Sequence, residues 1–213
     1  MPDLVSVELT LSPTEVPPSY PRDYERLLRL RDGRIVAIRP LLPCDAPALS
    51  EAIMTADADT LRRRFLGGRP RLTPAMLTRL TSLDYQRRFA LVAAAAGSRR
   101  GVAIARYEAV GDRVAEFAIA VDPAWRRIGL ATVLVELLAQ AALDRGIDEF
   151  SMSYLAENRP VAALIARSGG AGKQLIHQGI AEVVMALDRE KVDRAVRALQ
   201  PDFRGGGPSV GPS

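Results

Sequence analysis

The chain of 213 residues is 48% hydrophobic and 25% charged, so it can bury the core of one large domain, or one domain with tails, and global disorder is excluded. A net charge of +4 permits an anionic partner but does not by itself indicate nucleic acid. One cysteine, Cys44, and one histidine, His177, exclude an internal disulfide and argue against a metal centre or a Ser-His-Asp triad. The N-terminus lacks a basic signal-peptide start and no apolar run reaches the ~18 residues of a membrane span, so a cytoplasmic location without membrane contact is expected.

The first half of the chain predicts a hairpin, two helices and a three-stranded meander. Residues 1–24 are proline-rich and predicted to be irregular. Asp32-Gly33 joins two strand-like runs and indicates a β-hairpin, while Asp45 and Thr73-Pro74 have the character of helix N-termini. Short turns between neighbouring strands favour antiparallel pairing. The predicted elements are strands over 28–31 and 34–39, helices over 45–55 and 75–83, and strands over 89–96, 101–109 and 113–121.

The second half changes to helical spacing at Leu130 and then alternates strands with helices. The predicted elements are a helix over 130–145, a strand over 149–155, a helix over 159–167, a strand over 182–187 and a polar surface helix over 188–199. This order predicts an α/β domain over residues 25–200, with a central mixed, mostly antiparallel sheet flanked by helices. The Gly/Pro/Ser-rich tail, residues 201–213, is predicted to be disordered.

The segment with the clearest chemistry passes from a strand through a short loop into an amphipathic helix, and the loop contains Arg126-x-x-Gly129-x-Ala131. The first amides of a helix lack intrahelical acceptors and lie at the positive end of the helix dipole, which favours an anion there. Gly129 has no Cβ to hold a bulky anion away, and Arg126 and Arg127 add positive charge. The pattern predicts a phosphate or pyrophosphate site; the alternative is an ordinary helix start that contains a glycine.

Two segments resemble a known family. The run Val121-Asp-Pro-Ala-Trp-Arg-Arg-Ile-Gly-Leu-Ala is similar to the acetyl-CoA signature of the GCN5-related N-acetyltransferases (GNAT), and Leu155-Ala-Glu-Asn-Arg-Pro-Val-Ala-Ala-Leu-Ile-Ala-Arg-Ser-Gly169 is similar to a later segment of that family. The runs from Leu30 to Pro40 and from Ala115 to Phe117 further resemble protein-lysine acetyltransferases of actinobacterial type. The resemblance covers about residues 28–188 and implies a GNAT-like fold that binds acetyl-CoA.

The resemblance also implies which residues contact the cofactor. In the family, a strand backbone holds the pantetheine arm, helix amides hold the pyrophosphate and an Asn bonds the pantetheine or cysteamine end. The acyl group then lies where two neighbouring strands diverge. The positions implied here are Ile119, Ala120 and Val121 on the strand, Arg126, Arg127, Ile128, Gly129, Leu130, Ala131 and Thr132 at the helix start, and Asn158.

Glu116 is the candidate general base. An amine acceptor arrives mostly as ammonium and must lose a proton before it can attack a thioester, and a carboxylate can take that proton. Apolar neighbours suggest that Glu116 is buried, with a raised pKa; the alternatives are a solvent-facing Glu or one paired with Arg113, with water or Glu157 as the base. Many family members place a Tyr acid seven residues after the Asn, where this chain has Ile165.

The expected activity is transfer of an acetyl group to a primary amine. Protein lysine is the first acceptor considered, and a small amine or antibiotic is the second. Since Ile165 cannot donate a proton, a catalytically weak acyl-CoA-binding or interaction domain is the rival interpretation. A cluster of arginines would form a solvated face, or would hold an acidic protein or the cofactor's 3′-phosphate: Arg62, Arg63, Arg64, Arg69 and Arg71. The sequence leaves the acceptor and the oligomeric state open.

Overall fold

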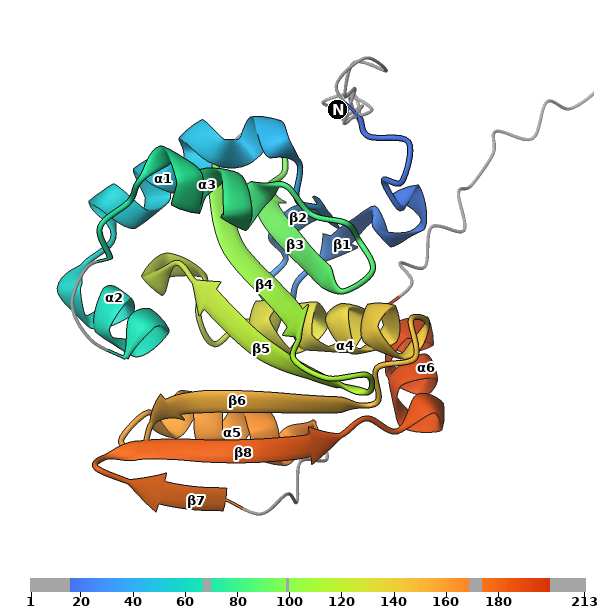
Figure 1. Cartoon of the computed structure of the whole chain (residues 1–213). Helices are drawn as coiled ribbons and strands as arrows, with labels where there is room; N and C mark the ends of the chain where they lie inside the picture. The colour runs from blue at the N-terminus through green and yellow to red at the C-terminus, as the bar shows by residue number, and fades with distance from the viewer. Residues whose placement is uncertain (1–15, 67–69, 99, 169–173, 200–213) are drawn as a thin grey trace, which may run out of the picture.

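One twisted sheet organises the molecule (Figure 1). The computed structural model describes residues 16–66, 70–98, 100–168 and 174–199. Within these residues eight strands form one sheet in the order β1-β2-β3-β4-β5-β6-β8-β7. The strands are β1 (Arg26–Arg29), β2 (Ile35–Pro40), β3 (Arg88–Ala95), β4 (Gly101–Ala109), β5 (Val114–Val121), β6 (Glu149–Leu155), β7 (Gln174–His177) and β8 (Ile180–Ala186).

Strand directions confirm a mixed, mostly antiparallel sheet. β1 to β5 form an antiparallel meander, and β6, β8 and β7 form a second antiparallel group. The two groups meet in one parallel pair, β5 with β6. A parallel neighbour requires a crossover connection, and the helix between β5 and β6 supplies it.

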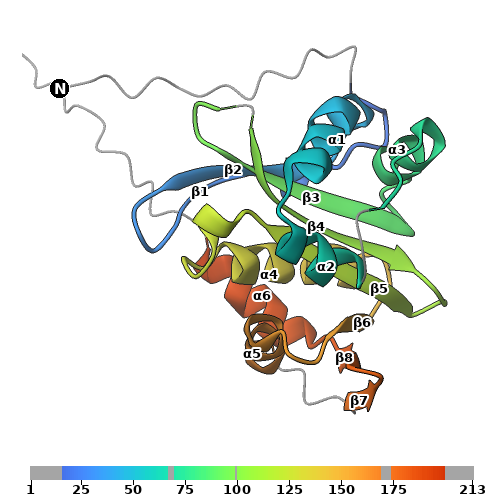
Figure 2. The same ribbon diagram turned by 90° about the vertical axis from the view of Figure 1, so that its left-hand side faces the viewer.

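Helices cover both faces of the sheet. They are α1 (Ala46–Thr55), α2 (Ala58–Phe65), α3 (Pro74–Thr81), α4 (Leu130–Leu143), α5 (Arg159–Arg167) and α6 (Arg189–Ala198), with 3-10 turns at Arg22–Tyr24, Pro43–Asp45 and Pro123–Trp125. Figure 2 shows α1, α2 and α3 on one side of the sheet and α4, α5 and α6 on the other. None of the helices in the described part of the chain is long and apolar enough to span a membrane.

A row of aromatic side chains in contact with one another connects the two strand groups. Phe150 on β6 stacks on Phe117 of β5 with ring centroids 5.4 Å apart, and lies 6.0 Å from Tyr107 of β4. Tyr107 in turn stacks on Phe89 of β3 at 5.8 Å. All four rings are buried. Because the parallel pair of β5 and β6 is short, packing of these aromatic rings stabilises the junction more than backbone hydrogen bonds do.

Several elements differ from the sequence prediction. The strand at 149–155 and the helix at 159–167 are confirmed, but α2 and β7 were not predicted. The helix α6 is not purely a surface element, because Val196 is buried. Tyr24, from the segment predicted to be irregular, packs edge-on against Phe89 at 5.2 Å. Residues 1–15 and the predicted tail lie outside the described residues.

Replacing Phe150 by Ala should therefore destabilise the protein strongly. We expect a loss of about 3–5 kcal/mol in the free energy of unfolding, because a large ring is removed from a filled core. Chemical denaturation followed by circular dichroism measures it. Met54→Ala, at a side chain that is 52% exposed on α1, is the control and should change stability little. A loss below about 1 kcal/mol for Phe150→Ala would show that the junction is held in another way.

A candidate acyl-CoA cleft between diverging strands

The cleft arises where β5 and β6 separate. Their parallel ladder has three residue pairs, and the last joins Glu116 to Ser151. Beyond this pair the two strands diverge, as Figure 1 shows. A cavity of about 950 Å³ opens between them, lined by the second half of β5, the loop before α4, α2 and the start of α5. The cavity lies at the position that the family resemblance implies for the acyl group.

The divergence turns backbone amides of β5 toward the cleft. The Asp122 N–H donates to the Val102 carbonyl of β4 at 2.8 Å. In an antiparallel ladder such bonds alternate along the strand, so the amides of Ile119 and Val121 point to the other side. β6 no longer pairs with β5 at those positions. Ile119, Ala120 and Val121 all line the cavity, as expected from the sequence.

The loop before α4 is tightly wound around its glycine. Arg127 and Gly129 both have left-handed backbone conformations, with φ of 66° and 97°. The first bond between turns of α4 runs from the Val133 N–H to the Gly129 carbonyl at 3.1 Å. The amides of residues 130–132 therefore have no acceptor within the helix and can serve an anion. A left-handed conformation is costly for a non-glycine residue such as Arg127, so the loop around it holds this conformation against strain.

Arginines surround this helix start, and one of them was not found by sequence reasoning. The Arg126 guanidinium donates to the Val121 carbonyl at 3.1 Å and to the Thr60 hydroxyl of α2 at 2.8 Å, so it joins the loop to two elements. Arg31, from the β1–β2 turn, also lines the cavity, and its Nε lies 3.6 Å from the position of a Cβ built on Gly129. The folded sheet brings Arg31 beside this helix start. The Asp-Gly motif in the sequence predicts the hairpin but not this long-range contact.

Helix α2 and Asn158 form another wall of the cleft. Asn158 is buried and accepts hydrogen bonds from the Val161 amide at 3.4 Å and from Arg63 at 3.1 Å. Arg62 pairs with Glu157 at 2.7 Å, with both side chains more than half exposed. The expected solvated face of arginines is thus partly wrong, because Arg63 and Arg64 line the cavity; Arg69 lies outside the described residues.

Glu116 lies at the point where the cleft begins. It is exposed, so the burial expected from its apolar neighbours is wrong: β5 alternates, and the neighbours Ala115 and Phe117 are buried on the opposite face. The alternative of a pair with Arg113 is also not realised, since Arg113 pairs with Asp148. Glu116 is instead directly opposite Glu108 on β4, lines the cavity, and lies close enough to two arginines to influence their pKa values.

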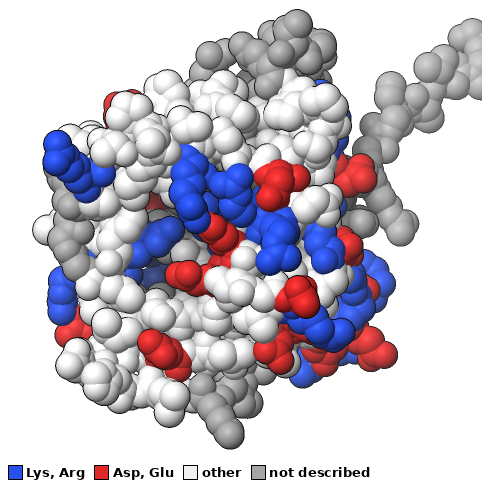
Figure 3. All heavy atoms as spheres, in the orientation of Figure 1, with Lys and Arg blue, Asp and Glu red and all other residues white. Residues whose placement is uncertain are grey.

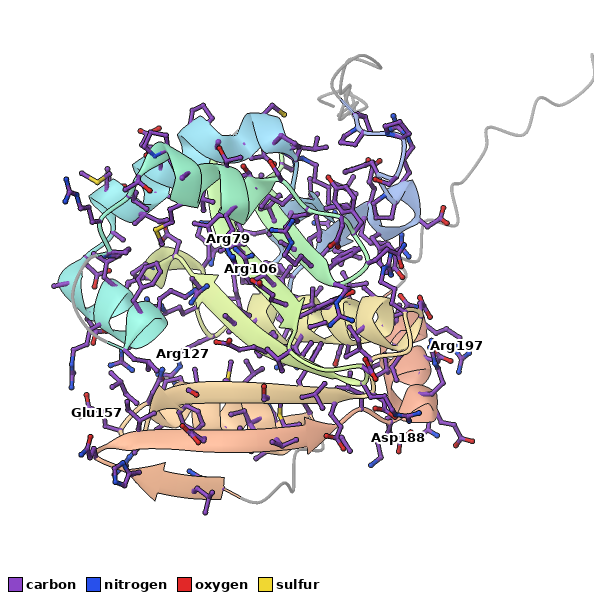
Figure 4. All side chains as sticks on the ribbon, viewed as in Figure 1. Arg79, Arg106, Arg127, Glu157, Asp188 and Arg197 are labelled. Atoms are coloured by element: carbon purple, nitrogen blue, oxygen red, sulfur yellow. The ribbon has the colours of Figure 1, made fainter. Side chains whose placement is uncertain are left out.

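Burial makes the charged forms of these two arginines, Arg64 and Arg106, less favourable. Burial, together with the positive charge of Arg106, lowers the pKa of Arg64 to about 10, and the Glu116 carboxylate counteracts this shift. Burial likewise lowers the pKa of Arg106, which Glu108 and Glu116 oppose. Figure 4 shows Arg106 on β4 below Arg79 of α3, and Arg127 near the diverging strand ends. Arg64 and Arg106 thus place positive charge near two carboxylates, Glu116 and Glu108, at the mouth of the cleft.

Comparison with known proteins gives the family. A family model described as the acetyltransferase (GNAT) family matches residues 57–170. The chain belongs to the GNAT family of acetyltransferases. An acetyltransferase of Pseudomonas aeruginosa is 32% identical over 148 residues, which is 68% of this chain and 80% of that protein. The protein is therefore an acyl-CoA-dependent N-acetyltransferase.

Two further GNAT relatives are actinobacterial. The crystal structure of the GNAT domain of Streptomyces lividans PAT superposes with a TM-score of 0.72 and 28% identity, covering 79% of this chain and 99% of that domain. Acetyltransferase Pat of Mycolicibacterium smegmatis is 26% identical over 168 residues, 78% of this chain. The match spans 49% of Pat, so about half of that relative has no counterpart in the aligned region.

Not every expected position of this GNAT site lines the cleft. Ile128, Leu130 and Thr132 do not contribute side chains to it, and Leu130 is buried in the core, so only their amides could hold a phosphate. Ile165 is also buried and offers no proton. Tyr154 does line the cavity, and its hydroxyl accepts a hydrogen bond from Gln174 at 3.1 Å. In the described part of the chain, no group of His, Cys, Asp or Glu side chains could hold a metal ion.

Gly129→Val should weaken acetyl-CoA binding at least tenfold, or by more than ~1.4 kcal/mol. The added side chain lies where the anion approaches, and the φ of 97° disfavours any side chain. Isothermal titration calorimetry measures the affinity. Gly146→Val is the matched control, because Gly146 also has a positive φ, of 78°, but lies at the far end of α4. Equal affinity in Gly129→Val and wild type would exclude the phosphate site.

Arg127→Ala should raise the KM for acetyl-CoA, and the defect should shrink as salt is added. The Arg127 side chain is exposed near the cleft, so its attraction for phosphate is screened by ions. Initial rates at several ionic strengths test this. Arg197→Ala, which removes an exposed arginine from the distant α6, should leave the KM unchanged (Figure 4). A defect that salt does not alter would indicate lost loop packing instead.

Proposed function

We propose that the protein transfers the acetyl group of acetyl-CoA to a lysine side chain of a protein, with Glu116 as proton acceptor. One observation carries the proposal: Glu116 occupies the last paired position before β5 and β6 diverge, with the amides of Ile119 and Val121 farther along the same strand. A proton acceptor and amide donors are thus fixed on one rigid element. The use of acetyl-CoA is supported by membership of the family.

The residues of the cleft fit a CoA thioester. The amides of residues 130–132, together with Arg127 and Arg31, would hold the pyrophosphate. The exposed amides of β5 would pair with the amide groups of the pantetheine arm, as an added strand pairs with a sheet edge. Asn158 would bond to the arm from the opposite wall. These contacts together would orient the thioester toward Glu116.

The chain's own groups can carry the proton and the developing charge. A lysine amine has an ordinary pKa of about 10.4 and must be neutral to attack. Glu116 would accept the proton, directly or through a water, while the positive charges of Arg64 and Arg106 disfavour an ammonium beside it. The Val121 amide would donate to the oxygen that becomes negative. With Ile165 at the position of the family's Tyr, the thiolate would leave without an acid from that position.

Protein lysine is supported by two similarities. Residues 30–40 and 115–117 resemble protein-lysine acetyltransferases of actinobacterial type, and 79% of the chain superposes on the GNAT domain of S. lividans PAT. The rival, a domain that binds acyl-CoA without turnover, rests on Ile165. Thiol release from acetyl-CoA in the presence of lysine peptides separates the two, because the rival binds acetyl-CoA and releases no thiol.

Glu116→Gln should lower turnover by ~10²–10⁴-fold, as expected for a lost general base. Acetyl-CoA affinity should stay nearly unchanged, because the helix amides and strand backbone supply that binding. Raising the pH should partly rescue the variant, since more of the acceptor amine is then already neutral. Thiol release at a series of pH values, with calorimetry for affinity, measures these effects.

Glu51→Gln is the matched control, because Glu51 is exposed on α1, away from the cleft. It should leave turnover and affinity as in wild type. If Glu116→Gln keeps most of the activity at pH 7, the proton leaves by another route, and Glu157→Gln becomes the next variant to measure.

A further inference from the structure

A second cavity opens on the other side of Glu116. It is a shallow groove of about 620 Å³ on the face of β6, β8 and β7, and we call it the acceptor groove. Glu116, Met152 and Ser153 line both this groove and the cofactor cleft. The two cavities therefore meet at the proposed base, and a molecule in the groove would reach Glu116 without crossing the cofactor.

The two cavities carry opposite charge. The cleft has seven arginines in its lining, against one acidic residue, Glu116. In the groove the charged residues, among those described, are Glu116 and Glu182. The Glu182 side chain is exposed and forms no ion pair with any residue that the structure describes. An anionic cofactor suits the first cavity and a cation the second.

The rest of the groove is apolar and exposed. Val110, in the β4–β5 turn, is 62% exposed, Leu175 on β7 is 68% exposed and Val184 on β8 is 44% exposed. In Figure 1 the front of β6, β8 and β7 has no helix over it, whereas α5 lies behind. The same region at the lower left of Figure 3 is mostly uncharged, while arginines gather over the strands above it. Such a surface can bind the aliphatic part of a long side chain.

Strand register fixes how far apart the two carboxylates lie. Glu116 is opposite Ser151, and Glu182 is opposite Ser153, two residues farther along β6. Two strand spacings of about 4.8 Å and two residues of about 3.3 Å put their Cα atoms on the order of 12 Å apart. That span matches two long side chains a few residues apart on an extended peptide.

We propose that the acceptor groove binds a lysine-containing protein segment that carries a second basic side chain near the acceptor lysine. The acceptor amine faces Glu116, the second cation pairs with Glu182, and apolar parts of the segment lie on Leu175, Val184 and Val110. This inference rests on the proposed function and adds the selectivity of the same site. It makes Glu182 a specificity-determining residue that takes no part in the chemistry.

A charge swap tests it. Two peptides share one lysine and differ in carrying either Arg or Glu at the second and fourth positions on each side. Wild type should acetylate the Arg peptide with a kcat/KM about five- to tenfold higher, as expected for an exposed ion pair that becomes a repulsion. Glu182→Gln should remove most of this preference, and Glu182→Lys should invert it. The matched control Glu51→Lys makes the same charge change on α1 and should keep the wild-type preference.

The outcomes separate the two proposals. If no peptide releases thiol from acetyl-CoA, the proposed function fails. If wild type turns over both peptides and the ratio is the same in Glu182→Lys, lysine acetylation stands and the groove proposal is overturned. Sedimentation equilibrium adds a second measurement: if Leu175→Asp converts a wild-type dimer into a monomer, the groove is an interface between two copies, and this too overturns the proposal.

Discussion

The short parallel ladder between β5 and β6 is the constraint on which the site depends. Three residue pairs hold the two halves of the sheet together, and stacked aromatic rings support them from below. Past Glu116 the strands separate, so the amides of Ile119 and Val121 lose a partner strand. A ligand with amide groups could take up the hydrogen bonds that these strand amides would otherwise make to water. The sheet is thus incomplete at the place where a CoA thioester would complete it.

The same divergence lies between two cavities that differ in charge. On the cleft side, Arg31 comes from the first hairpin, Arg63 from α2 and Arg127 from the loop before α4, so elements far apart in sequence supply one basic wall. On the groove side, the face of β8 and β7 contributes Glu182 and apolar side chains. A cofactor with several phosphates and an acceptor with a positive charge can therefore enter from different sides, each favoured by its own cavity.

Residue spacing and turn motifs predicted those parts of the site that lie within one continuous stretch of sequence. The loop from Arg126 to Gly129, the helix after it and the strand at 149–155 follow from spacing and turn chemistry, and the structure places them as expected. Sequence reasoning missed α2, whose eight residues are rich in arginine and show no long apolar stripe. It also missed Arg31, because nothing local to a β-turn indicates that it will lie beside a helix start some hundred residues later.

The exposure of Glu116 shows why periodicity alone misjudged its surroundings. Apolar neighbours on a strand indicate one buried face, and here that face belongs to Ala115 and Phe117, while Glu116 alternates to the other. The proposed base would need access from both cavities, which burial would prevent. Arg64 and Arg106 provide positive charge around it instead. With Glu116 as the proposed base, this charge would disfavour an ammonium there and so favour loss of its proton to Glu116.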